Sequence, residues 1–597
     1  MKVLSLHIKP VVWFNWLIFF AGVSVLHAAE SKISSIQFVG VTYFSERELL
    51  ETLPMKEQSL FTQAQVQQSL EALRRIYTQA SFFSLQIDSL QTNFSHDSSH
   101  VTISFYLTEG KQTFIAQLNV TGNARVNDAQ LRSLMDTKVG APLKQDILEN
   151  DIRVVLEYYN NNGFPLAKIS PQFDYENAMN EVHITLHIDE EVKVCITEIS
   201  VEGNSTTKNY VVAREARLSE NEIFAQKKFE RMQRRLQRLQ IFSSVSEPQV
   251  YLTDMANDSA VSNGGVLFTV QEGNANMFDG VLGYVPSATT GGDGYLTGAV
   301  NILLRNILGT GRKASVRWQR ETATTQELEL HYTEPWLGNI PLTASVAYFQ
   351  RKQDSSYVKN SITTRTEYAL SDELSVALSG DYESVYPSAS LQQFSVFEIS
   401  TLSYGVDFSY DTRNNVRVPT SGVRCELFYQ RGTKTITGPE QYLSLAPEKK
   451  YSIEKTSFAL QTFYSPLQRN VIALGVYGKQ LISNQIELSD MYQFGGTTTV
   501  RGYREKQFYG STMEWLNLEY RFLLDRSSSL FAFFDAGYFT RPAITTIGIA
   551  AQEKYLQGIG VGARIETNLG VISVSYALGQ GDTFSNGKIH FGIVNEF

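Results

Sequence analysis

The sequence predicts a chain of two parts: three tandem α+β repeats, each in the order strand, helix, helix, strand, strand, and then a transmembrane antiparallel β-barrel of about sixteen strands. Three observations predict this. A unit of 81 to 82 residues recurs three times before residue 273. Period-two alternation of apolar and polar residues then continues to the last residue. The N-terminus has the composition of a secretory signal.

The first 29 residues are expected to be a signal peptide. Lys2 and Lys9 precede an apolar run, 11–26, which ends near the small pair Ala28 and Ala29. A membrane anchor is the alternative, but the run is shorter than the ~20 residues that a spanning helix needs. No later stretch reads as a spanning helix, so a mature chain that crosses a membrane must do so as a closed barrel.

Composition narrows the class of protein further. The chain holds 30 Tyr, 35 Phe and 40 Gly against 15 Pro, which favours many short strands with aromatic belts. Its net charge of −9 argues against nucleic acid as a partner. The two cysteines, Cys195 and Cys425, lie in different parts of the predicted fold, so we expect no disulfide framework.

The three repeats share a strand that ends in glycine and a second that ends in acid. Gly40, Gly122 and Gly203 lie 82 and 81 residues apart. The same spacing holds for Glu109, Glu190 and Glu272.

Between these strands each repeat carries a helix with apolar residues at i, i+3, i+4 and i+7 spacing, such as Val66, Leu70, Leu73 and Tyr77 in the first. Such a helix buries one face against one partner layer. Spacing and order resemble POTRA (polypeptide-transport-associated) domains, over 30–110, 111–191 and 192–273.

The POTRA resemblance implies a periplasmic location and a role in receiving client polypeptides through an open sheet edge. A stiff spacer arm is the alternative. The third repeat has a basic helix that could meet anionic lipid or an acidic partner, although a solvated face is the favoured interpretation. Its cations are Lys227, Lys228, Arg231, Arg234, Arg235 and Arg238.

Residues 274–597 alternate with period two, which predicts the barrel. In 559–566 the residues Ile559, Val561 and Ile565 share one face, with glycine, Arg564 and Glu566 on the other. A soluble sandwich would alternate too, but its polar face need not carry this much charge on strand after strand.

The segment F-G-G-T-T-T-V-R-G-Y, 494–503, resembles the hallmark loop of the BamA and TamA superfamily of outer-membrane insertases and transporters. In that family the loop turns back into the barrel lumen. The resemblance assigns Val500, Arg501, Gly502 and Tyr503 to the motif. It also implies that Arg501 contacts inward-facing acids. The candidates are Asp535 and Glu519, with Asp535 favoured for its F-x-D-x-G setting. A bidentate guanidinium suits such a buried pairing.

Three other segments resemble turn and strand signatures of this family. They are N-I-L-G-T-G at 306–311, T-E-P-W at 333–336 and D-T-R-N-N at 411–415. Their Asn, Pro and Gly content suits tight reversals, so we assign them no chemistry. The glycines at 309 and 311 are not followed by G-K-[ST], so they do not form a phosphate loop.

The chain ends H-F-G-I-V-N-E-F, which resembles the recognition signal of a last barrel strand, with Phe591, Gly592 and terminal Phe597 as its marked residues. Asn595 departs from that signal. Because the family pairs its first and last strands poorly, the resemblance implies a lateral gate between about 277–285 and 588–597.

The resemblance to this family implies an outer-membrane protein of a Gram-negative bacterium that inserts unfolded outer-membrane protein clients. Three modules before one barrel match the TamA layout, whereas BamA usually carries five. Expected partners are such clients, outer-membrane lipids and a periplasmic protein of the TamB type or of the assembly machinery. No nucleic acid, nucleotide, metal or other cofactor is expected.

Two alternatives remain. One is a polypeptide secretion channel of the same superfamily. The other is a barrel enzyme such as a lipase or protease. Against an enzyme, His183 and His187 are interpreted as polar-face residues of one strand, and no catalytic constellation accompanies them.

Overall fold

A computed structural model describes residues 31–594 except 177–179, 218–220, 254–260, 274–275, 286–294, 339, 389–393, 417, 526–527 and 568–569. The expected signal peptide, Asn595 and Phe597 lie outside the described residues. The chain divides into two compact units, Met1–Lys193 and Val194–Phe597. In the described ranges, no helix has both the length and the apolar character needed to cross a membrane.

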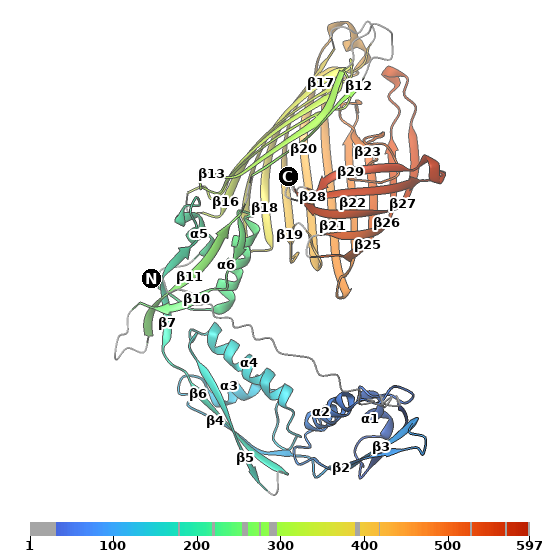
Figure 1. Cartoon of the computed structure of the whole chain (residues 1–597). Helices are drawn as coiled ribbons and strands as arrows, with labels where there is room; N and C mark the ends of the chain where they lie inside the picture. Colours follow the sequence, from blue (N-terminus) through green and yellow to red (C-terminus); the bar gives the residue numbers. More distant parts are fainter. Residues whose placement is uncertain are drawn as a thin grey trace, which may run out of the picture. The chain divides into compact units, whose positions relative to one another are not determined.

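The first unit holds two modules of the predicted order (Figure 1). The first consists of β1 (Lys32–Val39), α1 (Glu46–Thr52), α2 (Gln63–Gln79), β2 (Gln86–Phe94) and β3 (His100–Thr108). The second consists of β4 (Phe114–Thr121), α3 (Asp128–Ser133), α4 (Gln145–Asn161), β5 (Lys168–Glu176) and β6 (Glu181–Asp189). Their sheets have the orders β1-β3-β2 and β4-β6-β5. In each sheet the central strand runs parallel to the module's first strand, β3 to β1 and β6 to β4.

The third module belongs to the second unit and is more elaborate than predicted. It consists of β7 (Lys193–Glu202), α5 (Asn209–Ala216), β8 (Glu222–Ile223), α6 (Gln226–Arg238), β9 (Phe242–Val245), β10 (Gln249–Leu252) and β11 (Val261–Glu272). The single strand expected before β11 is split into β9 and β10, which both pair with β11. Pro248 lies between them and has no N–H for the ladder, so the strand is interrupted there.

The apolar residues predicted to lie along one face of each helix form part of the core of each module. Val66, Leu73 and Tyr77 are buried on α2, and Phe229 and Met232 are buried on α6. Each stripe packs against one face of its module's sheet, which has three strands in the first two modules and five in the third.

The 81 to 82 residue period has a structural cause. A Cβ added at Gly40, Gly122 or Gly203 would stand 2.0 Å from a carbonyl oxygen of the module's last strand, so that only glycine lets the backbones approach. The repeated glutamates accept hydrogen bonds from backbone amides of the loop that follows this glycine in each module.

The glutamates of the first two modules accept a hydrogen bond from a buried tyrosine, at 2.6 Å from Tyr77 to Glu109 and 2.9 Å from Tyr159 to Glu190. All three glutamates also accept from backbone amides of the loop after the repeated glycine, and Glu272 lies 2.6 Å from the Thr207 amide. Burial alone would raise the pKa of Glu272, but hydrogen bonds from Thr207 and its neighbours outweigh it and lower the pKa to about 2. Glu272 is therefore an ionised, structural residue at neutral pH.

In the described residues, sixteen antiparallel strands form the large sheet of the second unit, which confirms the predicted strand number. Neighbours in the sheet follow chain order from β12 to β29, apart from the short pair β23 and β24. The strands are β12 (Met277–Val285), β13 (Tyr295–Ile307), β14 (Arg312–Arg320), β15 (Gln326–Glu334), β16 (Leu342–Gln353), β17 (Tyr357–Ala369), β18 (Leu374–Pro387), β19 (Glu398–Asp411), β20 (Gly422–Gly438), β21 (Lys450–Leu467), β22 (Asn470–Ser483), β25 (Thr512–Leu523), β26 (Ser529–Arg541), β27 (Gln552–Thr567), β28 (Gly570–Gly579) and β29 (Lys588–Val594).

The two faces of this sheet differ as the alternation predicts. Ile559, Val561 and Ile565 of β27 are each more than half exposed on the outer face. On β25, by contrast, Trp515 and Glu519 are buried on the inner face. An outer face of large apolar side chains with a charged inner face is the pattern of a membrane barrel.

The basic helix α6 lies against one end of the barrel sheet. Arg235 binds Asp372, in the turn between β17 and β18, at 2.7 Å. Arg238 donates to the carbonyl oxygens of Asp372 and Asp411. The favoured interpretation of a solvated face is therefore wrong for these two arginines, because their partners are carboxylate and carbonyl oxygens of the same chain.

Two of the signature turns meet the same module. Trp336, in T-E-P-W, donates from Nε1 to Glu215 at 2.7 Å. The Lys208 amide donates to the Gly309 carbonyl, in N-I-L-G-T-G, at 2.8 Å. These segments are tight reversals as expected, and they also form the surface on which the third module docks.

Candidate functional site in the barrel lumen

A long excursion, 484–511, leaves the sheet between β22 and β25 and folds back against the inner wall. It contains the short hairpin β23 (Tyr492–Phe494) and β24 (Phe508–Gly510). Phe494 and Val500 are fully buried in a cluster that includes Trp515 of β25 and Phe539 of β26. Burial of these apolar side chains holds the excursion on β25 to β27.

Gly502 lets the motif approach the wall. Its φ is +93°, and an added Cβ would stand 2.6 Å from the Gly579 nitrogen of β28. Any other residue would be strained in φ and would collide with the backbone. Its neighbour Tyr503 is buried, and its hydroxyl lies 3.2 Å from both the Gln557 carbonyl and the Gln580 amide.

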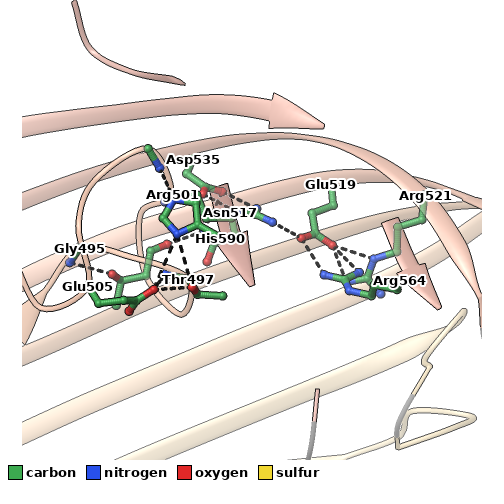
Figure 2. A network of polar contacts seen from close by, with 12 residues as sticks. Gly495, Thr497, Arg501, Glu505, Asn517, Glu519, Arg521, Asp535, Arg564 and His590 are labelled. Carbon is green, nitrogen blue, oxygen red and sulfur yellow. Dashed lines mark hydrogen bonds and ion pairs between the residues drawn. The ribbon is translucent and has the colours of Figure 1, made fainter. Parts of the chain in front are cut away.

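Arg501 binds both of the carboxylates named from the sequence (Figure 2). Its Nε and Nη2 donate to the two oxygens of Asp535, each at 2.7 Å, and its backbone amide donates to Asp535 at 3.0 Å. Nη1 donates to Glu519 at 2.7 Å. The side chains of Arg501, Asp535 and Glu519 are 7%, 0% and 8% exposed, so these are buried, charge-assisted hydrogen bonds.

A second layer surrounds this cluster. Arg564 of β27 donates to both oxygens of Glu519 at 3.0 Å, and Arg521 donates to one of them at 2.8 Å. Asn517 donates to Asp535 at 2.8 Å and to the Thr499 carbonyl at 2.7 Å. The Arg501 guanidinium also lies 3.5 Å from the Phe533 ring centroid, which favours the cation.

Sequence reasoning did not assign Arg521, Arg564 or Asn517 to the site. The alternation of each strand predicts that these three side chains point into the barrel, because each lies on the face opposite the apolar residues of its strand. Which inward residues meet was not visible, since it depends on the sheet register that places Asn517 opposite Asp535.

The excursion also contacts the last strand, through a residue that sequence reasoning passed over. The Gly502 amide donates to Nε2 of His590 at 3.0 Å. Thr497 Oγ1 and Glu505 Oε1 lie 3.4 Å and 3.7 Å from Nδ1 of the same ring. Next to it Phe591 is 55% exposed on the outer face, and an added Cβ at Gly592 would lie 3.6 Å from Thr497.

The chemistry available here is electrostatic. A cavity of about 490 Å³ adjoins the cluster and is lined by Arg501, Glu519, Arg521 and Arg564 among others. Across the residues that the structure describes, no group of three or more His, Cys, Asp or Glu is placed to hold a metal ion. Cys195 and Cys425 are both free. His183 and His187 lie near glutamine and threonine side chains on the polar face of β6.

Two family models match the chain. A model described as the Omp85 superfamily domain matches residues 306–597. The POTRA model, described as a surface antigen variable number repeat, matches residues 31–110, 113–191 and 194–273.

Similar proteins are outer-membrane assembly factors by name. The chain is 22% identical over 549 residues to the outer membrane protein assembly factor BamA of Nitratidesulfovibrio vulgaris, covering 85% of this chain and 65% of that protein. It is 22% identical over 516 residues to BamA of Neisseria meningitidis serogroup B, covering 81% and 62%. The chain thus spans less than two thirds of the length of these relatives.

Among solved structures, the crystal structure of BamA from Haemophilus ducreyi lacking POTRA domains 1–3 aligns with a TM-score of 0.52 at 16% identity. The alignment covers 80% of this chain and 98% of that one. The two proteins share a fold.

Proposed function

The chain belongs to the BamA and TamA (Omp85) superfamily of outer-membrane barrels with periplasmic POTRA domains, and from this premise we propose that it assembles client proteins into the outer membrane. The observation that carries the proposal is that one chain contains two kinds of open sheet edge. One kind lies in the POTRA modules, and the other lies in the barrel sheet. An open edge is a template for an extended polypeptide.

The POTRA edges are proposed to receive clients. In the described residues, β2 and β5 each pair on one side only, and most of their side chains are exposed. Beside the backbone edge, Tyr175 of β5 is 41% exposed and stacks on Phe173. Backbone groups would give sequence-independent affinity, while the aromatic surface would favour clients with alternating apolar residues.

The barrel edges are proposed to be the insertion site. β12 pairs only with β13 and β29 only with β28 in the described part of the chain, so the two strands flank a seam. A client strand that pairs at this seam would transfer its apolar face from water to lipid. This transfer stabilises the inserted strand by about 25 cal/mol per Å² of apolar surface removed from water. This step requires no nucleotide.

The test is depletion of the protein followed by a quantitative outer-membrane proteome. An insertase predicts a loss of many integral barrels. Loss of one secreted protein with the barrels intact would instead identify the secretion channel and overturn the proposal. Co-purification of a large periplasmic protein of the TamB type would distinguish a TamA-like complex from a minimal BamA.

A further inference from the structure

The barrel seam is crossed on its inner side by one short segment. Residues 497–506 of the excursion contact His590 of the last strand through Thr497, Gly502 and Glu505. Lys506, at the end of the segment, contacts β15 and the turn between β14 and β15. The two walls stand on opposite sides of the seam, because β29 is one edge of the sheet and β12 is the other.

The first attachment is the last strand. His590 is 5% exposed on its side chain and accepts the Gly502 amide at Nε2, at 3.0 Å. A backbone N–H can only donate, so this ring nitrogen must be the acceptor. The Thr497 amide donates to Glu505 at 2.6 Å, which closes the segment around the ring.

The second attachment is a balanced charge cluster. Lys506 Nζ lies 2.7 Å from both oxygens of Glu327 on β15 and 3.2 Å from Glu321, in the turn that follows β14. Arg351 of β16 binds Glu327 as well and is 7% exposed. Two cations thus meet two carboxylates, and the Arg351–Glu327 pair at the centre is 7% and 15% exposed, where ion pairs are less screened than at a surface.

The distance between these attachments is limited by the chain. Gly502 and Lys506 are four residues apart, so their Cα atoms cannot separate by more than about 14 Å. Arg501, immediately before Gly502, is held by Asp535 of β26 and Glu519 of β25. The segment therefore cannot extend to follow a widening seam without losing one attachment.

We propose that residues 497–506 form a clasp that holds the two sides of the seam together from the lumen, with His590 and Lys506 as its attachment points. The seam widens when either attachment is lost. The role of an open seam in client insertion rests on the proposed function. The clasp itself does not, since the width of the seam can be measured without a client.

The experiment measures the seam directly in the full-length protein in liposomes. Spin labels replace Tyr284 on β12 and Ile589 on β29, which are 65% and 74% exposed on the outer face. The native cysteines are first removed as Cys195→Ala and Cys425→Ser. Double electron–electron resonance then gives the distribution of label–label distances.

Two pairs of variants separate the clasp from general loss of stability. His590→Leu removes the acceptor for the Gly502 amide, whereas His590→Gln keeps an acceptor at the same position. Lys506→Ala removes the second attachment. Its matched control is Lys588→Ala, because Lys588 is similarly exposed, 33% against 30%, and its ion pair with Asp582 stays within the β28 to β29 turn.

We expect His590→Leu and Lys506→Ala to shift the distances upward by about one strand spacing, roughly 5 Å, while His590→Gln and Lys588→Ala stay at the wild-type distance. The clasp is overturned if the leucine variant keeps the wild-type distance or if the glutamine variant shifts equally. Widened seams with undiminished client assembly would support the clasp and count against insertion at the seam.

Discussion

Arg501 connects the excursion to the barrel wall at the scale of single residues. Its guanidinium makes three hydrogen bonds to carboxylates that are almost fully buried. Removing one partner of such a cluster leaves unpaired buried charge, which costs about 3 to 5 kcal/mol. The excursion would then lose its orientation in the lumen, although the sixteen-stranded sheet has many other contacts.

We predict that Arg501→Ala lowers the levels of outer-membrane barrels in a depletion strain while the variant itself stays in the membrane. Arg501→Lys should rescue only in part, because an ammonium cannot reproduce the planar fork. The control is Arg431→Ala, since Arg431 is 67% exposed and pairs loosely with Glu454 at 3.5 Å. Normal client levels with Arg501→Ala would show that the cluster is dispensable.

The repeated glycine of the modules provides a second prediction at this scale. Gly122 and Gly140 have the same φ of +83°, but only Gly122 faces a carbonyl, at 2.0 Å from an added Cβ. Gly140→Ala should cost about 1 to 2 kcal/mol for the left-handed backbone alone. Gly122→Ala should cost clearly more, because Ile188 must also move.

Urea unfolding of the segment 31–193 measures both costs. The difference between the two variants isolates the collision from the strain in φ. Equal stabilities would mean that β4 and β6 can separate freely at this point.

At the scale of elements, helix α6 and the turn between β17 and β18 hold the third module on the barrel. Asp372 accepts from Arg235 with its side chain and from Arg238 with its carbonyl. The side chains of Arg235 and Asp372 are 10% and 14% exposed, so their pair is only weakly hydrated. The module is therefore oriented by specific contacts rather than by the covalent link alone.

We predict that Asp372→Ala increases hydrogen exchange in α6, because it removes the carboxylate that holds Arg235. Glu373→Ala is the control, since the carboxylate of this adjacent residue accepts a hydrogen bond from the Ser371 hydroxyl in its own turn. Hydrogen–deuterium exchange with mass spectrometry on the full chain gives the readout. If α6 is equally protected in both variants, backbone contacts such as Lys208 to Gly309 hold the module by themselves.

At the scale of the whole molecule, the chain consists of two compact units, and the boundary falls at Lys193 and Val194. The third module lies with the barrel in the second unit. The first two modules form a separate body with their own cores.

We predict that deletion of residues 32–192, with the signal region retained, leaves a barrel that still enters the outer membrane. The second unit keeps its core and the docking contacts of α6, so it should resist extraction by urea. Client assembly should be lost, because both open edges β2 and β5 are removed. A truncated chain that restores client levels would argue that the first two modules are only a spacer.

Local patterns in the sequence carry a large part of this architecture. The three modules follow from a spacing of 81 to 82 residues and the barrel from period-two alternation, since both patterns report which face of a helix or strand is buried. The inward parity of Glu519 and Asp535 follows from the same alternation. The motif around Arg501 then pointed to these two acids.

The remaining contacts are non-local, and only the folded chain brings them together. Arg235 and Asp372 are 137 residues apart, and Lys506 and Glu327 are 179 apart. His590 looked like part of a terminal strand signal until the excursion placed the Gly502 amide against it. The alternation along a strand predicts which face of the sheet a side chain lies on. Strand register and the path of the excursion decide which inward residues meet, because both depend on the closing of long loops across the whole sheet.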